Sequence, residues 1–298
     1  MAGSDLPTIS VVVPVRNMAG SLPELLDSLQ ALDYPSDRLE VLVVDNGSTD
    51  GGGRIARERG AEVLDLPSPP SSYAARNAGW RRARGEWIAF TDADCRVEPA
   101  WLRGFALHDG DARAGAVAGE VLGAGDETVI SRLMDRHGFM QHRVTLPHKA
   151  LPGASTACLA VRRTVLERLG GFRGELRHFG DMDFCWRMQL ESDWQLRYEP
   201  RAVVRHHHRR TWKALVKQGI AHGRGVAFMK RTYPALYRFR GGEQAGRAAG
   251  LLRSLAAIPF PAAMPFRDRI AEPLFLAAWY GGMAAGYVMG PALVRRAR

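Results

Sequence analysis

The stretch Trp87-Ile88-Ala89-Phe90-Thr91-Asp92-Ala93-Asp94 joins a short apolar segment to a turn that carries two carboxylates. Four apolar residues in a row, bounded by turn residues, predict a strand that is buried on both faces. Strands of this kind are typical of parallel sheets covered by helices. The polar turn after the strand therefore lies at its carboxyl end, where open α/β sheets bind their ligands.

Upstream of this stretch, apolar runs alternate with segments of helical periodicity. The predicted strands are Ile9–Val13, Leu39–Val44 and Ala61–Leu66, and the predicted helices are Leu22–Leu29, a segment capped by Thr49 or Asp50 that ends at Arg59, and Tyr73–Arg84. This alternation indicates an α/β fold with a Rossmann-like, mostly parallel central sheet flanked by helices. Pro14, Asp45 and Asp92 all follow strands, so we expect them at one edge of the sheet.

Beyond about residue 110 the alternation weakens. We predict strands at Ala116–Leu122 and Ala157–Val161, a helix at Asp181–Leu190, an extended segment at Leu196–Val204 that is broken at Pro200, and a basic helix at Thr211–Thr232. Neither a G-x-G-x-x-G after the first strand nor a Walker P-loop is present, which disfavours dinucleotide-binding and P-loop proteins.

The net charge of +10 is concentrated in the last third of the chain. Residues 1–200 contain 23 Lys and Arg against 28 Asp and Glu, whereas residues 201–298 contain 18 against 3. A basic segment suits an anionic partner, such as a membrane surface or a phosphorylated ligand. Nucleic acid would suit it too, but no nucleic-acid-binding module is recognisable, so we expect no such partner.

The three cysteines, Cys95, Cys158 and Cys185, form neither a disulfide framework nor a C-x-x-C pair. This usage, and an N-terminus without the pattern of a signal peptide, lead us to expect a cytoplasmic protein.

Several sequence blocks occur in a fixed order, and together they carry a resemblance to a known family. The first four are Val11-Val12-Val13-Pro14-Val15-Arg16-Asn17, Val43-Val44-Asp45-Asn46-Gly47-Ser48-Thr49-Asp50, Ala75-Arg76-Asn77-Ala78-Gly79 and Phe90-Thr91-Asp92-Ala93-Asp94-Cys95. A fifth comprises Gly170-Gly171-Phe172 and Gly180-Asp181-Met182-Asp183-Phe184-Cys185-Trp186-Arg187. Over about residues 8–232 the chain resembles the family 2 glycosyltransferases of bacteria and other organisms, which are inverting enzymes with the GT-A fold.

The resemblance implies a nucleotide-sugar donor, with a UDP-sugar expected. It assigns Pro14, Val15, Arg16 and Asp45 to the nucleotide base, Arg76 to the ribose or diphosphate, and Asp92 to the ribose or sugar. Asp94 of the D-x-D motif would ligate Mn²⁺ or Mg²⁺, which neutralises charge on the leaving diphosphate. Taken singly, the D-x-D motif also fits a solvated acidic turn, Asp45 a turn cap, and Arg76 a surface charge on a helix.

In this resemblance Asp181 is the general base that removes the proton from the acceptor hydroxyl. The common pattern at this position is Glu-Asp-x-Asp, and Gly180 stands in place of the Glu, which puts acceptor binding in question. Asp183 points to another helix face, and we expect it to be structural. A helix-capping carboxylate is the alternative interpretation of Asp181.

A histidine shortly after the base completes the metal site in many relatives, and His206 is the candidate here. In an extended segment His208 would face the same side and is the reserve candidate, whereas His207 would face away. A solvated basic turn is the alternative.

Residues 273–294 carry no formal charge and are long enough to span a bilayer. Three alternatives stay open: a spanning helix, an interfacial helix or hairpin, and a buried or oligomer-forming helix with Gly282, Gly286 and Gly290 on one small face. A second uncharged stretch, 254–266, and the flanking arginines would suit an anionic lipid surface at the inner face of the cell membrane.

We therefore expect a GT-A domain at residues 1–232 and a helical, basic, membrane-associated extension at residues 233–298. Residues 1–110 would bind the nucleotide and residues 111–232 the acceptor. The expected function is inverting, metal-dependent transfer of a sugar to a hydroxyl on a lipid-linked glycan, a cell-envelope glycan or a secondary metabolite. A catalytically inactive scaffold that binds membrane or a partner enzyme is the alternative.

Overall fold

The computed structural model describes residues 6–66, 71–125, 128–147, 151–237 and 265–291. These residues group into two compact units. The first unit comprises the described residues up to 124 and those from 138 to 207, and the second comprises those from 125 to 137 and from 208 to 291.

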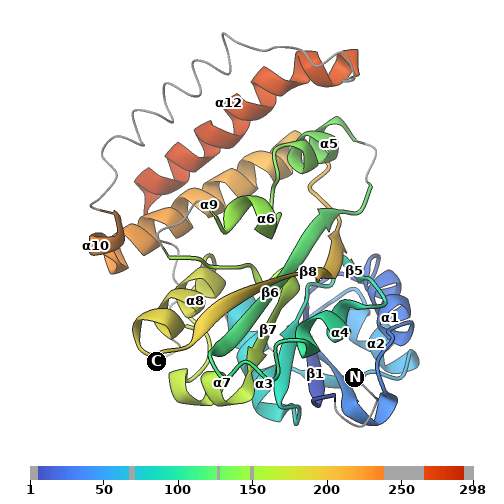
Figure 1. The fold of residues 1–298 in the computed structure, drawn as a ribbon. Coiled ribbons are helices and arrows are strands. Elements are labelled where there is room, and N and C mark those ends of the chain that lie inside the picture. The colour runs from blue at the N-terminus through green and yellow to red at the C-terminus, as the bar shows by residue number, and fades with distance from the viewer. Residues whose placement is uncertain (1–5, 67–70, 126–127, 148–150, 238–264, 292–298) are drawn as a thin grey trace. The chain divides into compact units, whose positions relative to one another are not determined.

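The first unit is built on one sheet with helices on its faces (Figure 1). The strands are β1 (Ile9–Val15), β2 (Leu39–Asp45), β3 (Glu62–Asp65), β4 (Trp87–Phe90), β5 (Cys95–Val97), β6 (Ala114–Gly123), β7 (Leu159–Arg162) and β8 (Gln195–His206). Their order is β3-β2-β1-β4-β7-β6-β8-β5. Four of the neighbouring pairs are parallel and three are antiparallel, which confirms the mostly parallel sheet.

Seven α-helices of the first unit lie among the described residues, beside two single-turn 3-10 helices at Ser36–Arg38 and Thr156–Cys158. The α-helices are α1 (Leu22–Gln30), α2 (Gly52–Glu58), α3 (Ser72–Arg82), α4 (Trp101–Ala106), α6 (His142–Thr145), α7 (Arg163–Leu169) and α8 (Gly180–Leu190). The predicted helix at Leu22–Leu29 is present as α1, and all four of its leucines are buried. Helix α2 begins later than predicted because Gly51 adopts φ 84°, while Asp50 Oδ1 accepts a hydrogen bond from the Gly52 N–H. Strand β5 and the helices α4, α6 and α7 were not predicted, because they are too short to show a period.

The prediction that the extended segment breaks at Pro200 is wrong. Strand β8 runs through this residue, and its register on β6 shifts between the pairs Ala118–Tyr198 and Glu120–Val203. At a bulge some residues of one strand are left unpaired. A proline there, which has no N–H to donate, therefore removes no hydrogen bond between the strands. The proline therefore marks an irregularity in the pairing instead of a strand end.

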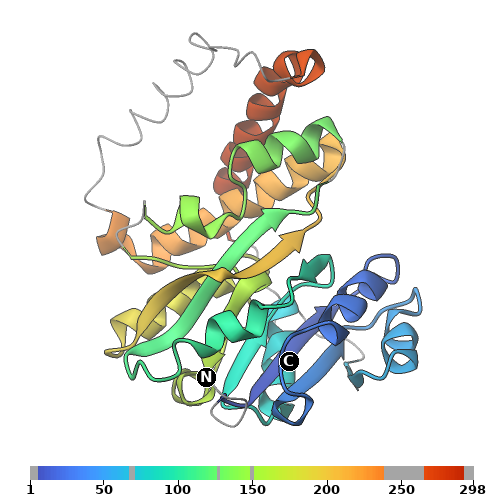
Figure 2. The ribbon, with the colours of Figure 1, turned by 45° about the vertical axis from the view of Figure 1, so that its right-hand side comes forward.

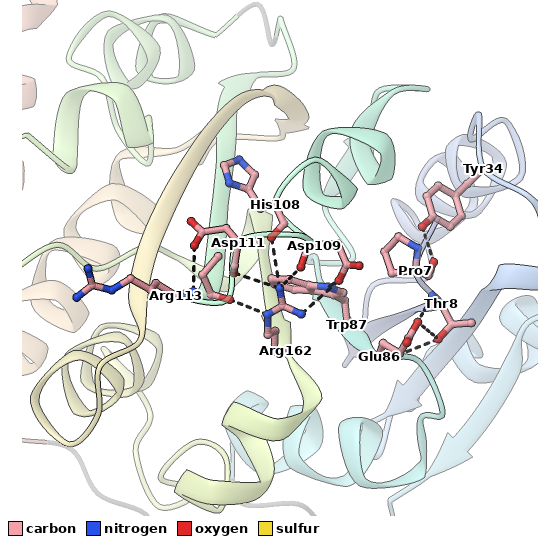
Figure 3. A network of polar contacts seen from close by, with 11 residues as sticks. Pro7, Thr8, Tyr34, Glu86, Trp87, His108, Asp109, Asp111, Arg113 and Arg162 are labelled. Atoms are coloured by element: carbon pink, nitrogen blue, oxygen red, sulfur yellow. Dashed lines mark hydrogen bonds and ion pairs between the residues drawn. The ribbon is translucent and has the colours of Figure 1, made fainter. Parts of the chain in front are cut away.

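A network of contacts around Arg162 links the strands at the end of the sheet where the parallel strands begin, opposite their carboxyl ends (Figure 3). The Arg162 guanidinium donates to the carbonyl oxygen of Ala114 at 2.9 Å and to that of Asp111 at 3.2 Å. It also lies over the ring of Trp87, 4.4 Å from the ring centroid, and the indole N–H of Trp87 donates to Asp109 at 2.8 Å. These contacts join β4, β6 and β7 at the end of the sheet that carries none of the predicted site residues.

The second unit is helical. Its described helices are α5 (Val129–Arg136), α9 (Trp212–Thr232), α10 (Pro234–Tyr237) and α12 (Phe266–Met289). Helices α9 and α12 run side by side (Figure 2). The long helix α9 was predicted, whereas α5 was not, and α12 starts before the uncharged segment and continues through Pro273.

Small residues make the contact between α9 and α12. A Cβ on Gly282 would lie 2.8 Å from the carbonyl oxygen of Val216, and a Cβ on Gly286 would lie against the carbonyl of Ile220. The predicted small face of Gly282 and Gly286 is therefore used inside the chain, where it lets two helix backbones approach closely. Gly290 lies at the end of the helix, with φ 77°.

The other face of α12 is apolar and exposed within the described part of the chain. Its exposed large residues are Phe266, Ile270, Leu274, Tyr280, Tyr287, Val288 and Met289. None of the helices in the described residues combines the length and the apolar character needed to cross a membrane. The predicted uncharged stretch 254–266 lies outside the described residues except for its last two positions, and so do the arginines of residues 292–298.

Candidate active site

The loops after β1 and β2 are linked by side-chain hydrogen bonds. Asn17, which has φ 54°, accepts through Oδ1 from the Thr49 N–H at 2.8 Å, and its own N–H donates to Ser48 Oγ at 3.1 Å. Asp50 Oδ2 accepts from the Ala19 N–H at 2.8 Å, and this hydrogen bond lowers the pKa of the Asp50 carboxyl. The Asn-Gly-Ser turn chemistry thus fixes one loop against the other at the predicted edge.

The four residues predicted to hold the base lie where these two loops begin: Pro14 and Val15 end β1, Arg16 follows it, and Asp45 ends β2. Val15 is directly opposite Asp45 in the parallel register of β1 and β2, and it is buried, whereas Pro14 is half-buried and Arg16 is exposed. Asp45 Oδ1 accepts from the Ser48 N–H at 2.8 Å, so this carboxylate closes its own turn. The alternative of a turn cap describes part of what Asp45 does.

Arg76 and Asp92 form an ion pair between α3 and the turn after β4. The Arg76 side chain is 5% exposed and that of Asp92 is 30% exposed, so the pair has a buried cationic end and an open anionic end. The Arg76 Nε is buried and has no hydrogen-bond partner in the structure. Because this N–H is unpaired, the Arg76 guanidinium retains the capacity to donate a further hydrogen bond.

Asp94 and His206 are brought together by the antiparallel ladder of β5 and β8. In this register Cys95 lies opposite His206, and the His207 N–H donates to the Asp94 carbonyl oxygen at 2.9 Å. The Asp94 Oδ2 lies 3.6 Å from the His206 Nε2, and His206 is almost fully buried. Burial and the nearby carboxylates of Asp92 and Asp94 raise the pKa of the Cys95 thiol, which keeps this residue an inert part of the core.

The alternation predicted for the three histidines matches their burial. His206 and His208 are buried, and half-exposed His207 lies 2.9 Å from Glu24. His206 is the histidine beside Asp94, whereas the Nε2 of His208 lies 4.0 Å from the Asp135 carboxylate.

Asp181 lies in the first turn of α8, where the helix dipole favours a carboxylate. Its Oδ1 accepts from the Met182 N–H at 2.9 Å and from the hydroxyl of Tyr73 at 3.1 Å, and its Oδ2 accepts from the Thr156 N–H at 3.2 Å. Asp183 is fully buried between Arg187 and Arg173, as expected for a structural residue.

Tyr73 is a residue of this site that the motifs did not indicate. It lies one turn before Arg76 on α3, and the Arg76 guanidinium lies over its ring, 5.5 Å from the centroid. A continuous series of contacts therefore runs from Asp92 through Arg76 and Tyr73 to Asp181. The i, i+3 spacing of Tyr73 and Arg76 was the available sequence signal, because residues so spaced share a helix face.

The donor set fits a divalent cation that is shared with a phosphate ligand. No group of three or more His, Cys, Asp or Glu that could hold a metal occurs among the described residues. Carboxylate–imidazole pairs such as Asp94 and His206 suit Mn²⁺. In proteins, cations that act on phosphates are commonly held by one or two protein groups while the substrate supplies further oxygens.

The chain is also similar in sequence to a known protein family. Residues 10–170 match the sequence profile described as "Glycosyl transferase family 2". The chain is 33% identical to glycosyltransferase AglE of Haloferax volcanii over 231 residues, which cover 74% of each protein. It is 29% identical to the pre-mycofactocin glycosyltransferase of Mycobacterium tuberculosis over 234 residues, 76% of this chain but only 48% of that relative, so the chain spans about half of the latter's length.

Among solved structures, the mannosyltransferase PcManGT from Pyrobaculum calidifontis, in complex with GDP-Man and Mn²⁺, superposes with a TM-score of 0.67. The superposition covers 95% of this chain and 86% of that one at 22% sequence identity. At this identity the likeness establishes the fold, and it confirms the predicted GT-A architecture.

Proposed function

Because the chain belongs to glycosyl transferase family 2, we propose that it moves a sugar from a nucleoside-diphosphate donor to an acceptor hydroxyl with inversion at the anomeric carbon. The observation that carries this proposal is the series of contacts linking Asp92 and Arg76 to Asp181 at one edge of the sheet. A phosphate-binding cation and a proton-accepting carboxylate are the two groups that such a displacement requires.

In the proposed reaction Asp181 takes the proton of the acceptor hydroxyl. The acceptor oxygen forms a bond to the anomeric carbon while the bond from that carbon to the diphosphate oxygen breaks, and the nucleoside diphosphate leaves with the electron pair. Arg76 binds the oxygens on which the negative charge grows. When bound between Asp94 and His206, Mn²⁺ or Mg²⁺ would supply further positive charge to the diphosphate.

The donor half comprises about residues 1–110 and the acceptor half about residues 111–232 in this proposal. The base of the donor lies against Pro14, Val15, Arg16 and Asp45, and Asp92 faces its ribose or sugar. Both UDP and GDP belong among the candidate nucleotides, since GDP-Man is bound in the solved mannosyltransferase of similar fold.

A thermal-shift screen of UDP, GDP and their sugar conjugates, with and without Mn²⁺, tests this proposal. A ligand that binds the native state raises the unfolding temperature, so the donor nucleotide should do so in a Mn²⁺-dependent manner. If no nucleotide shifts the transition, the function of a catalytically inactive scaffold is favoured instead.

We also propose that the exposed apolar face of α12 rests on an anionic membrane at its cytoplasmic side. This face carries Tyr280 and Tyr287 among aliphatic residues, and no charged residue follows Glu272 in the described part of α12. Aromatic side chains and basic neighbours such as Arg267 favour the interface of anionic lipids. A lipid-linked acceptor would then be presented at the same surface.

Flotation with vesicles tests the membrane proposal. The protein should float with phosphatidylglycerol-containing vesicles more than with phosphatidylcholine alone, and the difference should shrink at high salt because charge attraction is screened. Leu274→Glu should reduce flotation, whereas Leu107→Glu, at an exposed leucine of the first unit, should not. Equal flotation of the two variants and the parent would contradict the proposal.

A further inference from the structure

Gly180 leaves space that the ring of Tyr73 occupies. A Cβ on Gly180 would lie 2.7 to 2.9 Å from three atoms of this ring, which is closer than real Cβ contacts. Any other residue at position 180 would therefore displace the ring from the side of α8. The absence of a side chain at position 180 and the presence of Tyr73 belong to one arrangement.

The ring of Tyr73 is held by packing. It is tilted against Phe172 with 5.9 Å between the centroids, and Phe172 in turn packs on Phe184 of α8 at 4.8 Å. Asn77 of α3 fixes Phe172 by donating to its carbonyl oxygen at 2.7 Å and accepting from its N–H at 2.9 Å. The direction of the Tyr73 hydroxyl is consequently set by α3 and α8 together.

The hydroxyl can act only as a donor to the neighbouring carboxylate. Burial, followed by the charge of Asp181, raises the pKa of Tyr73 well above its ordinary value, so the phenol keeps its proton at any working pH. Asp181 Oδ1 then accepts two hydrogen bonds, from Tyr73 and from the Met182 N–H, whereas Oδ2 accepts one, from Thr156. A carboxylate oxygen offers about two acceptor sites, so Oδ2 retains the capacity to take a proton.

We infer that Tyr73 is a positioning residue for Asp181: its hydroxyl occupies Oδ1 and directs Oδ2 to the acceptor hydroxyl, and its ring, which lies beside the Arg76 guanidinium, joins the base to the Arg76–Asp92 pair. This inference rests on the proposed function. The proton of the acceptor passes to Asp181 Oδ2, and Tyr73 neither gains nor loses a proton in the step.

The test is Tyr73→Phe, which removes the hydroxyl and keeps the ring. Nucleotide release from UDP-glucose or GDP-mannose, whichever the parent turns over with Mn²⁺, should show kcat lowered about tenfold or more, the effect of one hydrogen bond to a charged group. The KM for the donor and the calorimetric Kd for UDP or GDP should stay within about twofold, because the nucleotide-binding groups are unchanged.

Tyr34→Phe is the matched control. The hydroxyl of Tyr34 is also buried and donates to the Pro7 carbonyl oxygen at 2.6 Å, at the opposite edge of the sheet (Figure 3). This variant should lower the unfolding temperature and leave kcat unchanged.

Gly180→Ala provides a second, independent variant, because its Cβ should displace the ring. It should lower kcat as Tyr73→Phe does, and the double variant should be no slower than the worse single variant, since both changes break the same hydrogen bond. Unchanged kcat in a folded Tyr73→Phe protein would overturn the inference. A parent protein that binds no nucleotide would instead overturn the proposed function, so the two failures are distinguishable.

Discussion

Replacing Arg76 by Met should weaken nucleotide binding while leaving the free energy of unfolding nearly unchanged. The side chain is 5% exposed, its Nε lacks a partner, and its ion-pair partner Asp92 is 30% exposed and can be rehydrated. The lost pair is worth about 1 kcal/mol, because one end is open to solvent. Removing a buried unsatisfied donor gives back about 1–3 kcal/mol. The free energy of unfolding should therefore stay within about 2 kcal/mol of the parent value.

The affinity for nucleotide, in contrast, should fall clearly. Hydrogen bonds from a guanidinium to phosphate are charge-assisted, and losing about 1.5–3 kcal/mol weakens binding roughly 10- to 100-fold. Calorimetric titration of UDP or GDP with Mn²⁺ measures this loss, and urea unfolding followed by tryptophan fluorescence measures stability.

Arg162→Met is the matched control, because Arg162 is also largely buried but its guanidinium donates to several carbonyl oxygens at the opposite edge of the sheet. This variant should lose about 2–4 kcal/mol, because buried acceptors are left without donors. Its folded fraction should bind nucleotide as the parent does. The reasoning would be refuted if Arg76→Met lost as much stability as Arg162→Met and kept its nucleotide affinity.

Four further outcomes are expected. Asp94→Ala should raise the Mn²⁺ concentration for half-maximal nucleotide release about tenfold or more, and an unchanged Mn²⁺ titration would exclude Asp94 as a ligand. Burial raises the pKa of the Cys158 thiol to about 12, so a disulfide reagent at pH 8 should label it only as the protein unfolds in urea; rapid labelling without urea would contradict this. The hydrogen bonds from Arg132 lower the pKa of the Asp268 carboxyl in the folded protein. The stabilisation that they provide is therefore present above the ordinary pKa of about 3.9 and is lost as the pH falls below that value. Melting temperatures should fall less steeply between pH 6 and pH 3 in Asp268→Asn than in the parent. Gly286→Ala should cost about 1–3 kcal/mol in circular dichroism melts, because its Cβ would strike the α9 backbone, and an unchanged melt would argue against this helix packing.

The fold was predictable wherever a segment repeats a clear period. The buried apolar runs of β1, β2 and β4 and the leucine spacing of α1 each identified an element, and the parallel order followed from their alternation. Short elements such as β5 and α4 carry too few residues to show a period. The bulge around Pro200 depends on the pairing of β8 with β6, which the local sequence does not contain.

The candidate site, too, was predictable from the sequence only in part. Residues close to the ends of predicted strands, such as Asp45 and Asp94, could be placed at the carboxyl ends of the strands from sequence alone. The pairing of Asp94 with His206 required the β5–β8 register, and the contact of Tyr73 with Asp181 joins residues on α3 and α8 that are far apart in the sequence. Gly180 looked like a defect in a motif, and only the structure shows that an aromatic ring fills its place.

Nucleotide release by the parent and by Asp181→Asn, with Mn²⁺ and matched nucleotide affinities, tests the central claim most directly. Asparagine keeps the size of the side chain and removes the capacity to accept a proton, so release should fall at least about 100-fold while UDP or GDP binds as before. Release at the parental rate from a folded Asp181→Asn protein would contradict the assignment of this edge of the sheet as the catalytic site.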